Sequence, residues 1–502
     1  MVLVAAVAAV IVRFAFLQTP AGGLDGDEAI TGIMARRMAA GHGFPLFFLG
    51  QDYGGAIEQY PQALLFLLGV PVTPLTLRIP QLAAAGLLTA LTYLAGTRLL
   101  PSRWHAALAA GLFALGPYFL IWKGARSHSG YVAEQVVILV AVLAVFGIEH
   151  DAGRRRLARS ALAGFCFAIT YWISPSGYVV LVPLGLWFLG SVRRDLRALA
   201  LAAAGGLVGL APIGAWVLRY GRLPVPDPGY LPTTAGDRLG NLLDEVGREF
   251  VGVAWLYGEP GWPVVLGRLA VWSLLVAVGV ALVVRARGVL AMARLRQEDR
   301  RPFDVLLLSV PLAAGAFVAS KYAWFTTEPR YLFVMFPVLV LGLARLAPNH
   351  PRWGPAVAAV VVVLVSGTSV TMLVTRADDA PGTRDRDLPA VIEVLTAERE
   401  TFVYADYWTA APLEYLAGDR LTVGSLTAFE RLPDERRAVD AAGASAWVAS
   451  RGVNTDDITP MRQALEAAGV RYRERAFGDV SVFDELVPDV RPWEIGLGGP
   501  AG

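Results

Sequence analysis

The segment LDGDEAITGIMARRMAAGHGFPLFFLGQDYGGAIEQY, residues Leu24–Tyr60, is a polar, glycine-rich stretch between long apolar runs. It carries the carboxylates Asp25, Asp27, Glu28, Asp52 and Glu58. Unpaired carboxylates are costly inside a lipid bilayer, so a membrane protein keeps them at a water-exposed surface or builds them into a functional site. Other features of the sequence are needed to distinguish a water-exposed loop from a functional site.

The composition indicates a membrane protein. Of 502 residues, 55% are hydrophobic and 17% are charged, and the mean hydropathy is +0.51. Soluble domains carry about 25% charged residues. The apolar runs match the thickness of a bilayer core and predict a polytopic α-helical membrane protein with about 11 transmembrane helices. These runs cover residues 2–17, 78–100, 104–121, 132–148, 160–175, 177–191, 197–218, 264–284, 304–320, 330–347 and 354–375.

Several classes of function are disfavoured by composition. The net charge of +2 argues against a nucleic-acid partner. The single cysteine, Cys166, excludes an intrachain disulfide. No H-E-x-x-H or Cys/His set indicates zinc, and no metal site is predicted. The oxygens of Asp25, Asp27 and Glu58 would suit Mg²⁺ or Mn²⁺, which leaves a divalent cation open as a cofactor that no pattern requires.

The arginines predict the orientation. Alternate loops are strongly basic, and cytoplasmic loops of membrane proteins are the basic ones. We therefore expect a multi-pass membrane protein with a cytoplasmic N-terminus. The first outer loop, residues 18–60, and the chain after Thr375 would then lie outside. Arg13, near the outer end of the first run, is expected to extend its side chain to the interface.

Two short helices are expected in the first outer loop. Residues 29–40 place Ile30, Ile33, Met34 and Met38 at a spacing of three to four, and residues 57–68 form a second apolar helix. Short helices with one apolar stripe beside a membrane lie in the plane of the interface.

The chain after the last apolar run has a different character. Residues 1–375 form the membrane domain, and residues 376–400, charged and with Pro and Gly, are expected to be a linker. Strands and helices then alternate over 401–491, which predicts a small extracytoplasmic α/β C-terminal domain. Residues 492–502 are expected to be disordered. The domain lacks a nucleotide-binding motif, which favours a lid or a partner-docking role over chemistry.

The acidic pair at the start of the first expected helix has two interpretations. Asp25 is best explained as a helix cap or a solvated residue, since Asp satisfies the free N–H groups of a helix N-terminus. For Asp27, spacing alone gives capping and catalysis equal weight.

The run D-E-A-I-T-G-I-M-A-R-R-M, residues 27–38, resembles the first extracytoplasmic loop of the GT-C superfamily of integral membrane glycosyltransferases. The resemblance is closer to the bacterial protein-mannosyltransferase and aminoarabinose-transferase-like group. It implies eleven to thirteen spans, an outer loop with two juxtamembrane helices, and often a soluble outer C-terminal domain. It also implies transfer of a sugar from a polyprenyl phosphate carrier to a cell-envelope acceptor on the outer face of the membrane.

The resemblance assigns roles in the acidic pair. Asp27 matches the acidic residue regarded as the catalytic base, and Glu28 matches the residue beside it. A positioned carboxylate can take the proton of an attacking hydroxyl, and a single displacement inverts the anomeric centre.

The sequence departs from the group at the end of this loop. Relatives of the aminoarabinose-transferase type carry a Lys-Pro-Pro-like stretch there, whereas residues 54–61 read GGAIEQYP and contain no lysine. The carrier phosphate must then be bound elsewhere. Glu58 is either a second polar residue of the site or a water-facing carboxylate.

Two further clusters are candidate substrate-binding sites. The first holds Lys123, Arg126, His128 and Glu134 between apolar runs. An ionisable residue such as Glu134 inside a span is functional by default. The alternative for the cationic residues is that they anchor helix ends at the interface.

The second cluster holds Lys321, Arg330 and Tyr331. Its R-Y-L…P pattern, from Arg330 to Pro337, resembles the start of a late GT-C helix in which an arginine faces the carrier phosphate. An arginine can hold phosphate with two parallel hydrogen bonds. Interfacial anchoring explains Arg330 and Tyr331 about as well.

Two other functions are compatible with the sequence. A lipid or glycan transporter or flippase would place carboxylates near the bilayer midplane and show an internal repeat. The acidic residues gather instead in an outer loop, and no convincing repeat is present. A non-catalytic membrane protein whose C-terminal domain docks partners would tolerate alanine substitutions in the first loop.

Overall fold

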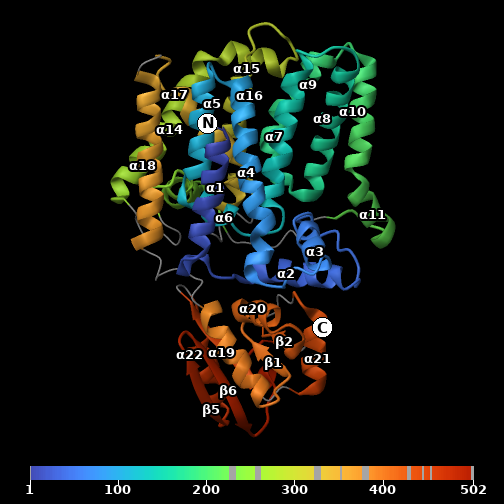
Figure 1. Cartoon of the computed structure of the whole chain (residues 1–502), viewed down its shortest axis with the longest axis vertical. Helices are drawn as coiled ribbons and strands as arrows, with labels where there is room; N and C mark the ends of the chain where they lie inside the picture. The colour runs from blue at the N-terminus through green and yellow to red at the C-terminus, as the bar shows by residue number, and fades with distance from the viewer. Residues whose placement is uncertain are drawn as a thin grey trace.

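The computed structural model describes residues 2–224, 233–254, 262–320, 329–350, 353–375, 384–426, 431–443, 446–452 and 455–498. Every apolar run of the sequence is helical, and the helices run side by side away from a C-terminal α/β unit (Figure 1). The long elements are α1 Val2–Leu17, α4 Pro74–Leu99, α5 Arg103–Leu115, α6 Tyr118–Gly124, α7 Tyr131–Ile148, α8 Gly153–Ile173, α9 Tyr178–Val192, α10 Leu196–Gly209, α11 Ala211–Tyr220, α14 Val264–Val284, α16 Phe303–Ala319, α17 Phe336–Leu346 and α18 Trp353–Thr375.

Short elements connect these helices. They are the 3₁₀ turns η1 Pro20–Gly22, η2 Pro175–Gly177 and η5 Pro329–Met335, the π-helical turn η3 Leu242–Val246, and the helices α12 Ala235–Asn241, α13 Gly247–Phe250 and α15 Ala286–Ala293.

The number of spans is supported only in part. Within the described residues, six segments are long and apolar enough to cross a membrane, or up to eight if each bent pair is one span. The bent pairs are α5 with α6, at 66°, and α10 with α11, at 47°. Helices α1 and α16 are apolar but shorter. The chain is thus a multi-pass helical membrane protein, and the number eleven stays a prediction.

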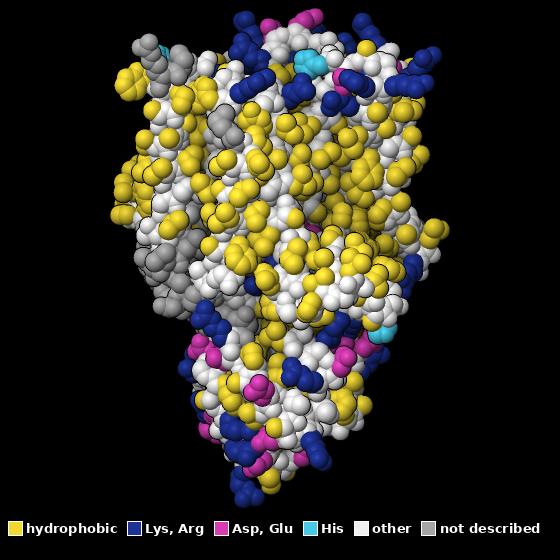
Figure 2. All heavy atoms as spheres, viewed as in Figure 1, with side chains coloured by type: hydrophobic (Ala, Val, Ile, Leu, Met, Phe, Trp, Pro, Cys, Tyr) yellow, Lys and Arg dark blue, Asp and Glu magenta, His cyan; other side chains and the backbone are white. Residues whose placement is uncertain are grey.

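The surface has the polarity that a bilayer requires. Hydrophobic side chains cover the middle of the helical bundle, whereas Lys and Arg side chains gather at the end farthest from the C-terminal unit (Figure 2). Basic residues at one end of a bundle are typical of a cytoplasmic face.

The prediction for Arg13 is wrong. Its side chain is 1% exposed and donates hydrogen bonds to three carbonyl groups, those of Ala9 at 3.2 Å, Ala114 at 3.0 Å and Phe113 at 3.4 Å. Helix α5 ends where the chain bends into α6, so its last carbonyls have no partner within the helix. A buried cation at a helix C-terminus satisfies these groups and their negative partial charge.

The two helices of the first outer loop are α2 Gly26–Ala39 and α3 Gln59–Leu67. Helix α2 begins three residues before the expected residue 29, because Asp25 caps it. It lies between the bundle and the C-terminal unit (Figure 1). Its apolar stripe was expected to face the membrane interface, but Ile30, Ile33 and Met34 are buried against other parts of the protein. That protein surface includes Ala411 and Tyr415 of the C-terminal unit, so protein packing replaces the predicted lipid contact.

The C-terminal unit is a sheet with helices on both faces. Its strands are β1 Phe402–Ala405, β2 Thr422–Ser425, β3 Ala446–Gly452, β4 Thr455–Asp456, β5 Arg471–Phe477 and β6 Val480–Val487, and its helical elements are α19 Arg384–Ala397, α20 Tyr407–Ala417, η7 Gly418–Arg420, α21 Pro433–Ala442, α22 Ile458–Ala467 and η8 Pro492–Ile495. The strand order is β2-β1-β3-β6-β5, and β4 pairs with β3. Strand β1 pairs in parallel with β2 and β3, and β6 pairs antiparallel with β3 and β5.

Side chains on the two faces of the sheet form two separate hydrophobic cores. Val403 and Ala405 face α19 and α20, whereas Tyr404 between them faces α21 and α22. Successive side chains of a strand point to opposite faces of the sheet, which explains both layers.

The boundaries of this unit differ from the expected ones. Residues 384–397 were expected to be linker, yet they form α19, whose Leu388, Val391, Ile392 and Leu395 are buried on the sheet. Residues 492–498 were expected to be disordered, yet Trp493 packs edge-on against Tyr404. Both segments owe their order to tertiary contacts.

Gly32 is required where α2 meets α20. A Cβ atom at Gly32 would overlap the ring of Tyr415, whose hydroxyl donates to the carbonyl of Thr73 at 3.1 Å. We predict that Gly32→Ala weakens docking of the C-terminal unit by about 1–3 kcal/mol through overpacking, although alanine favours helix. Hydrogen exchange of α2 and α20 measures this. Gly185→Ala in α9, where an added Cβ meets nothing within 4 Å, is the control. Unchanged exchange in Gly32→Ala would contradict the prediction.

Burial of Glu414, in α20, makes the stability of the C-terminal unit depend on pH. Burial raises its pKa to about 7 from 4.5; the nearby charges are Glu435 and, on α2, Arg36 and Arg37. Between these pH values the unfolded chain releases its proton and the folded chain keeps it, so the free energy of unfolding falls as pH rises.

The expected fall is up to about 3 kcal/mol between pH 4.5 and 7. Denaturation of the C-terminal unit within the full chain, followed at several pH values, measures it. Glu414→Gln should flatten the profile, whereas Glu393→Gln on the exposed side of α19 should keep it. A Glu414→Gln profile as steep as that of the wild type would refute the assignment.

Candidate active site

Asp25 joins the start of α2 to the predicted cluster that holds Lys123, Arg126 and His128. Its carboxylate accepts hydrogen bonds from the backbone N–H of Glu28 at 2.8 Å and from Nε2 of His128 at 2.5 Å. Burial alone would raise the pKa of Asp25, but His128, Arg126 and Lys123 hold that pKa far below its ordinary value. Asp25 is therefore a charged helix cap, as expected.

Arg126 holds the chain that leads into α2. Its side chain is fully buried and donates to the carbonyls of Ala21 and Gly23, the latter at 2.8 Å. Its guanidinium lies 4.7 Å from the ring centre of Trp122. Lys123 has its ammonium 5.2 Å from the ring centre of Tyr131. The structure thus brings Lys123, Arg126 and His128 together around Asp25.

Glu28 is buried in an ion pair. Nε and Nη2 of Arg78, in α4, donate to its two carboxylate oxygens at 2.8 and 2.6 Å. Arg78 also donates to the carbonyl of Gly23 at 3.1 Å. Arg78 was not predicted as a site residue, although a charged residue at the start of an apolar run was a usable signal.

Glu58 joins the first loop to α7. One oxygen accepts the N–H groups of Val132 and Ala133 at 2.9 and 3.2 Å, and the other accepts Gln81 and Ser127 at 3.2 and 3.4 Å. The side chain is 6% exposed, so it does not face water. A carboxylate here satisfies free N–H groups at the positive end of α7.

Glu134 is buried one turn into α7. Ser176 of η2 donates to its Oε1 at 2.7 Å. The contact ties α7 to the turn between α8 and α9. Glu58 lies close enough to influence its charge electrostatically.

Asp27 differs from these carboxylates. It is half-buried on the first turn of α2, and among the described residues none donates a hydrogen bond to it or forms an ion pair with it. By contrast, Asp52 pairs with Arg222 at the surface. Asp27 is thus the one carboxylate of the loop whose oxygens are unclaimed by the described part of the chain.

The surroundings of Asp27 come from distant parts of the sequence. Burial raises the pKa values of Tyr53 and Tyr407, and both rings also feel the negative charge of Asp27 and the positive charges of Arg431 and Arg330. Arg330 is the second residue of η5, whereas Tyr407 and Arg431 belong to the C-terminal unit. Of the predicted residues, Asp27 and Arg330 thus act electrostatically on the same two tyrosine rings. Tyr53, Tyr407 and Arg431 were missed, since no local pattern marks them.

Lys321 lies outside the described residues. Tyr331, next to Arg330, is half-buried and packs on the core of the bundle. The trio Asp25, Asp27 and Glu58 does not form a metal site: among the described residues, no group of three His, Cys, Asp or Glu side chains comes together in a geometry that could hold an ion.

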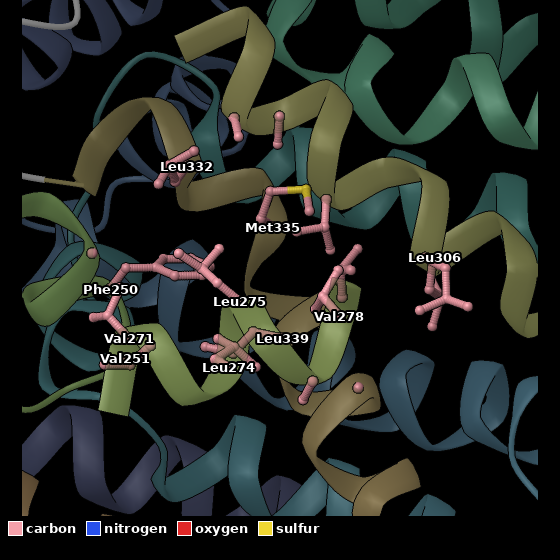
Figure 3. Close-up of a pocket in the computed structure, with 18 of the residues that line it drawn as sticks. Phe250, Val251, Val271, Leu274, Leu275, Val278, Leu306, Leu332, Met335 and Leu339 are labelled. Atoms are coloured by element: carbon pink, nitrogen blue, oxygen red, sulfur yellow. The ribbon is translucent and has the colours of Figure 1, made fainter. Parts of the chain in front are cut away.

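An apolar cavity of about 170 Å³ opens beside η5. Leu332 and Met335 of η5 line it together with side chains from α13, α14, α16 and α17, and Figure 3 shows them around one space. Leu332 follows Arg330 by two residues. Segment η5 thus carries a cation, Arg330, and also contributes to the lining of an apolar cavity.

Comparisons with known proteins concern the fold. No protein-family model matches the chain, and no curated protein matches it. The solved structure of ArnT from Cupriavidus metallidurans in the apo state matches with a TM-score of 0.63 at 13% identity, over 99% of this chain and 98% of that chain.

Two further structures are similar at lower scores. ArnT from Cupriavidus metallidurans bound to undecaprenyl phosphate gives a TM-score of 0.49 at 13% identity, over 99% of this chain and 98% of that chain. The Archaeoglobus fulgidus oligosaccharyltransferase tethered with an acceptor peptide gives 0.48 at 12%, over 99% and 74%. The match to apo ArnT confirms the predicted resemblance at the level of the fold: over nearly its whole length, this chain shares the fold of that structure.

Proposed function

We propose that this protein is a membrane glycosyltransferase with Asp27 as its general base. It would move a sugar from a polyprenyl phosphate carrier to a hydroxyl group of a cell-envelope acceptor on the outer face of a bacterial inner membrane. The observation that carries the proposal is the state of Asp27. Among the described residues no partner binds this carboxylate of the loop, its charge and that of Arg330 act on the same tyrosine ring, and the chain has the fold of ArnT.

The reaction follows from these groups. The acceptor oxygen attacks the anomeric carbon of the sugar while Asp27 takes its proton. The bond from that carbon to the carrier phosphate breaks, and the bonding electrons stay on the phosphate oxygen. Because attack and departure occur on opposite faces, the anomeric configuration inverts. No cofactor takes part in these proposed steps.

Arg330 and the apolar cavity fit the donor. The leaving phosphate needs a fixed positive charge, which Arg330 supplies. The carrier also has a long hydrocarbon chain, and the cavity beside η5 offers it an apolar surface. Lys321, in the same predicted cluster, remains a further candidate for the phosphate.

The other predicted residues act as supports in this proposal. Glu28 is held by Arg78 and Glu58 by the start of α7, so both fix the position of Asp27 and neither contacts substrate. Lys123, Arg126 and His128 hold Asp25, and the positive charges of Lys123 and Arg126 add to the attraction for an anionic carrier. Glu134 stabilises the turn at η2.

The orientation extends the same proposal. The basic end of the bundle would face the cytoplasm, with the N-terminus, and the C-terminal unit would lie outside, where the first loop and Asp27 also lie (Figures 1 and 2).

Asp27→Asn tests the base. We expect sugar transfer to fall by about 10²–10⁴-fold, because the amide cannot accept the proton, while expression and thermal stability stay near wild type. The assay uses purified protein in lipid, radiolabelled polyprenyl phosphate sugars and envelope extract. Asp52→Asn, which removes a surface carboxylate of the same loop, is the control. Undiminished transfer by Asp27→Asn would refute the role; carrier lipid moved across the bilayer without sugar transfer would indicate a flippase.

Arg330→Gln tests the phosphate contact. Loss of a charge-assisted hydrogen bond costs about 1.5–3 kcal/mol, so the Kd for polyprenyl phosphate should rise by about 10- to 150-fold. Fluorescence titration in nanodiscs measures the Kd. Arg222→Gln removes an exposed guanidinium that pairs with Asp52 and should leave the Kd unchanged. Equal affinities of wild type and Arg330→Gln would contradict the assignment.

A further inference from the structure

The C-terminal unit is fixed against the first outer loop. Ala411 and Tyr415 of α20 share one buried apolar cluster with α2. Ion pairs flank the cluster: Arg36 lies 3.6 Å from Glu414, and Arg37 pairs with Glu435. The unit thus has a defined position relative to Asp27.

This docking brings the first turns of two helices together. Asp25 caps α2, and Asp406 caps α20 by accepting the N–H groups of Trp408 and Thr409 at 2.9 and 3.1 Å. Asp406 also accepts the N–H of Ser450 at 2.8 Å, which anchors it to the sheet. The ring of Trp408 lies 3.7 Å from the place where a Cβ of Gly26 would be, directly before Asp27.

Arg431 forms a second bridge. Its Nη1 donates to Gln51 Oε1 at 3.0 Å and to the carbonyl of Leu49 at 3.3 Å, both in the first loop. Its guanidinium lies 5.4 Å from the ring centre of Phe48. The bridge holds the loop that carries Tyr53 against the C-terminal unit.

Aromatic surface is left open at this junction. Trp408 is 42% exposed and Tyr53 is 41% exposed. Such rings combine an apolar face with a polar edge, and binding sites use them with a few charged groups to orient a ligand. The faces of a sugar ring that carry only C–H groups are suited to stack on such rings.

The geometry of the displacement reaction indicates which substrate this aromatic surface contacts. In the proposed function the hydrocarbon chain of the carrier occupies the cavity lined by helices of the bundle, so its phosphate departs toward the bundle. The acceptor hydroxyl must attack from the opposite face of the anomeric carbon, and α20 lies on the side of α2 away from the bundle (Figure 1).

We infer that the C-terminal unit forms the acceptor-binding wall of the site, with Tyr53, Tyr407, Trp408 and Arg431 holding a carbohydrate head group. This rests on the proposed function and adds the acceptor's chemical class and the residues that bind it. The unit is then part of the enzyme's specificity.

Trp408→Ala and Arg431→Gln test this assignment in the full-length protein. The donor is the radiolabelled polyprenyl phosphate sugar that the wild type turns over, and the acceptor is a glycolipid fraction of cell envelope, titrated. We expect the half-saturating amount of glycolipid to rise by about tenfold or more in each variant. The Kd for polyprenyl phosphate should stay within about twofold of the wild-type value.

Arg437→Gln is the control, because Arg437 is exposed on α21 and pairs only locally with Asp434. Hydrogen exchange of α2 and α20 reports docking. If either variant loses docking, Tyr407→Phe, which removes one hydroxyl, replaces it in the titration, and the same rise is expected.

Three results would overturn the inference. An unchanged half-saturating amount in docked variants would show that the wall does not bind the acceptor. A raised Kd for polyprenyl phosphate with an unchanged acceptor titration would assign the wall to the donor. No transfer by the wild type with any donor would instead refute the proposed function, and this inference with it.

Discussion

The buried ion pair between Glu28 and Arg78 joins α2 to α4, and the positions of Asp27 and the C-terminal unit depend on it. Two buried charges are stable only when they are paired with good geometry, and removing one partner costs about 3–5 kcal/mol. Here both carboxylate oxygens are bound, and Arg78 also binds the carbonyl of Gly23. The start of α2 is therefore fixed to the membrane bundle by a contact that has little freedom to shift.

The remaining acidic residues of the loop extend this arrangement. Asp25 joins the same helix start to His128, and Glu58 joins the end of the loop to α7. Each carboxylate is used where a helix N-terminus or a cation requires one. Asp27 has the opposite environment, half-buried and without a described partner, and that contrast makes it a candidate for chemistry.

The apolar stripe of α2 packs against the C-terminal unit. Ile30, Ile33 and Met34 pack in the cluster that also includes Tyr415, so one short helix connects the bundle to the sheet. Because Asp27 lies on the first turn of this helix, any movement of the C-terminal unit relative to the bundle would alter the surroundings of the carboxylate. The architecture thus places Asp27 at the junction of the two parts.

The sequence by itself determined the helical membrane class, the alternation of strands and helices in the C-terminal unit, and the importance of the first loop. These properties follow from hydropathy, from periodicity and from a motif of adjacent residues, all of which are local. The capping role of Asp25 could be predicted for the same reason. Only the tertiary structure decided which groups the other charges meet. Arg13 binds carbonyls that are free because α5 bends into α6, and Glu58 caps a helix that begins more than seventy residues later. The charge of Asp27 acts on the ring of Tyr407, far along the chain, and Arg431 binds Gln51 of the first loop. Such partners are set by how elements pack, because the energy of a buried charge depends on neighbours that have no fixed separation in sequence.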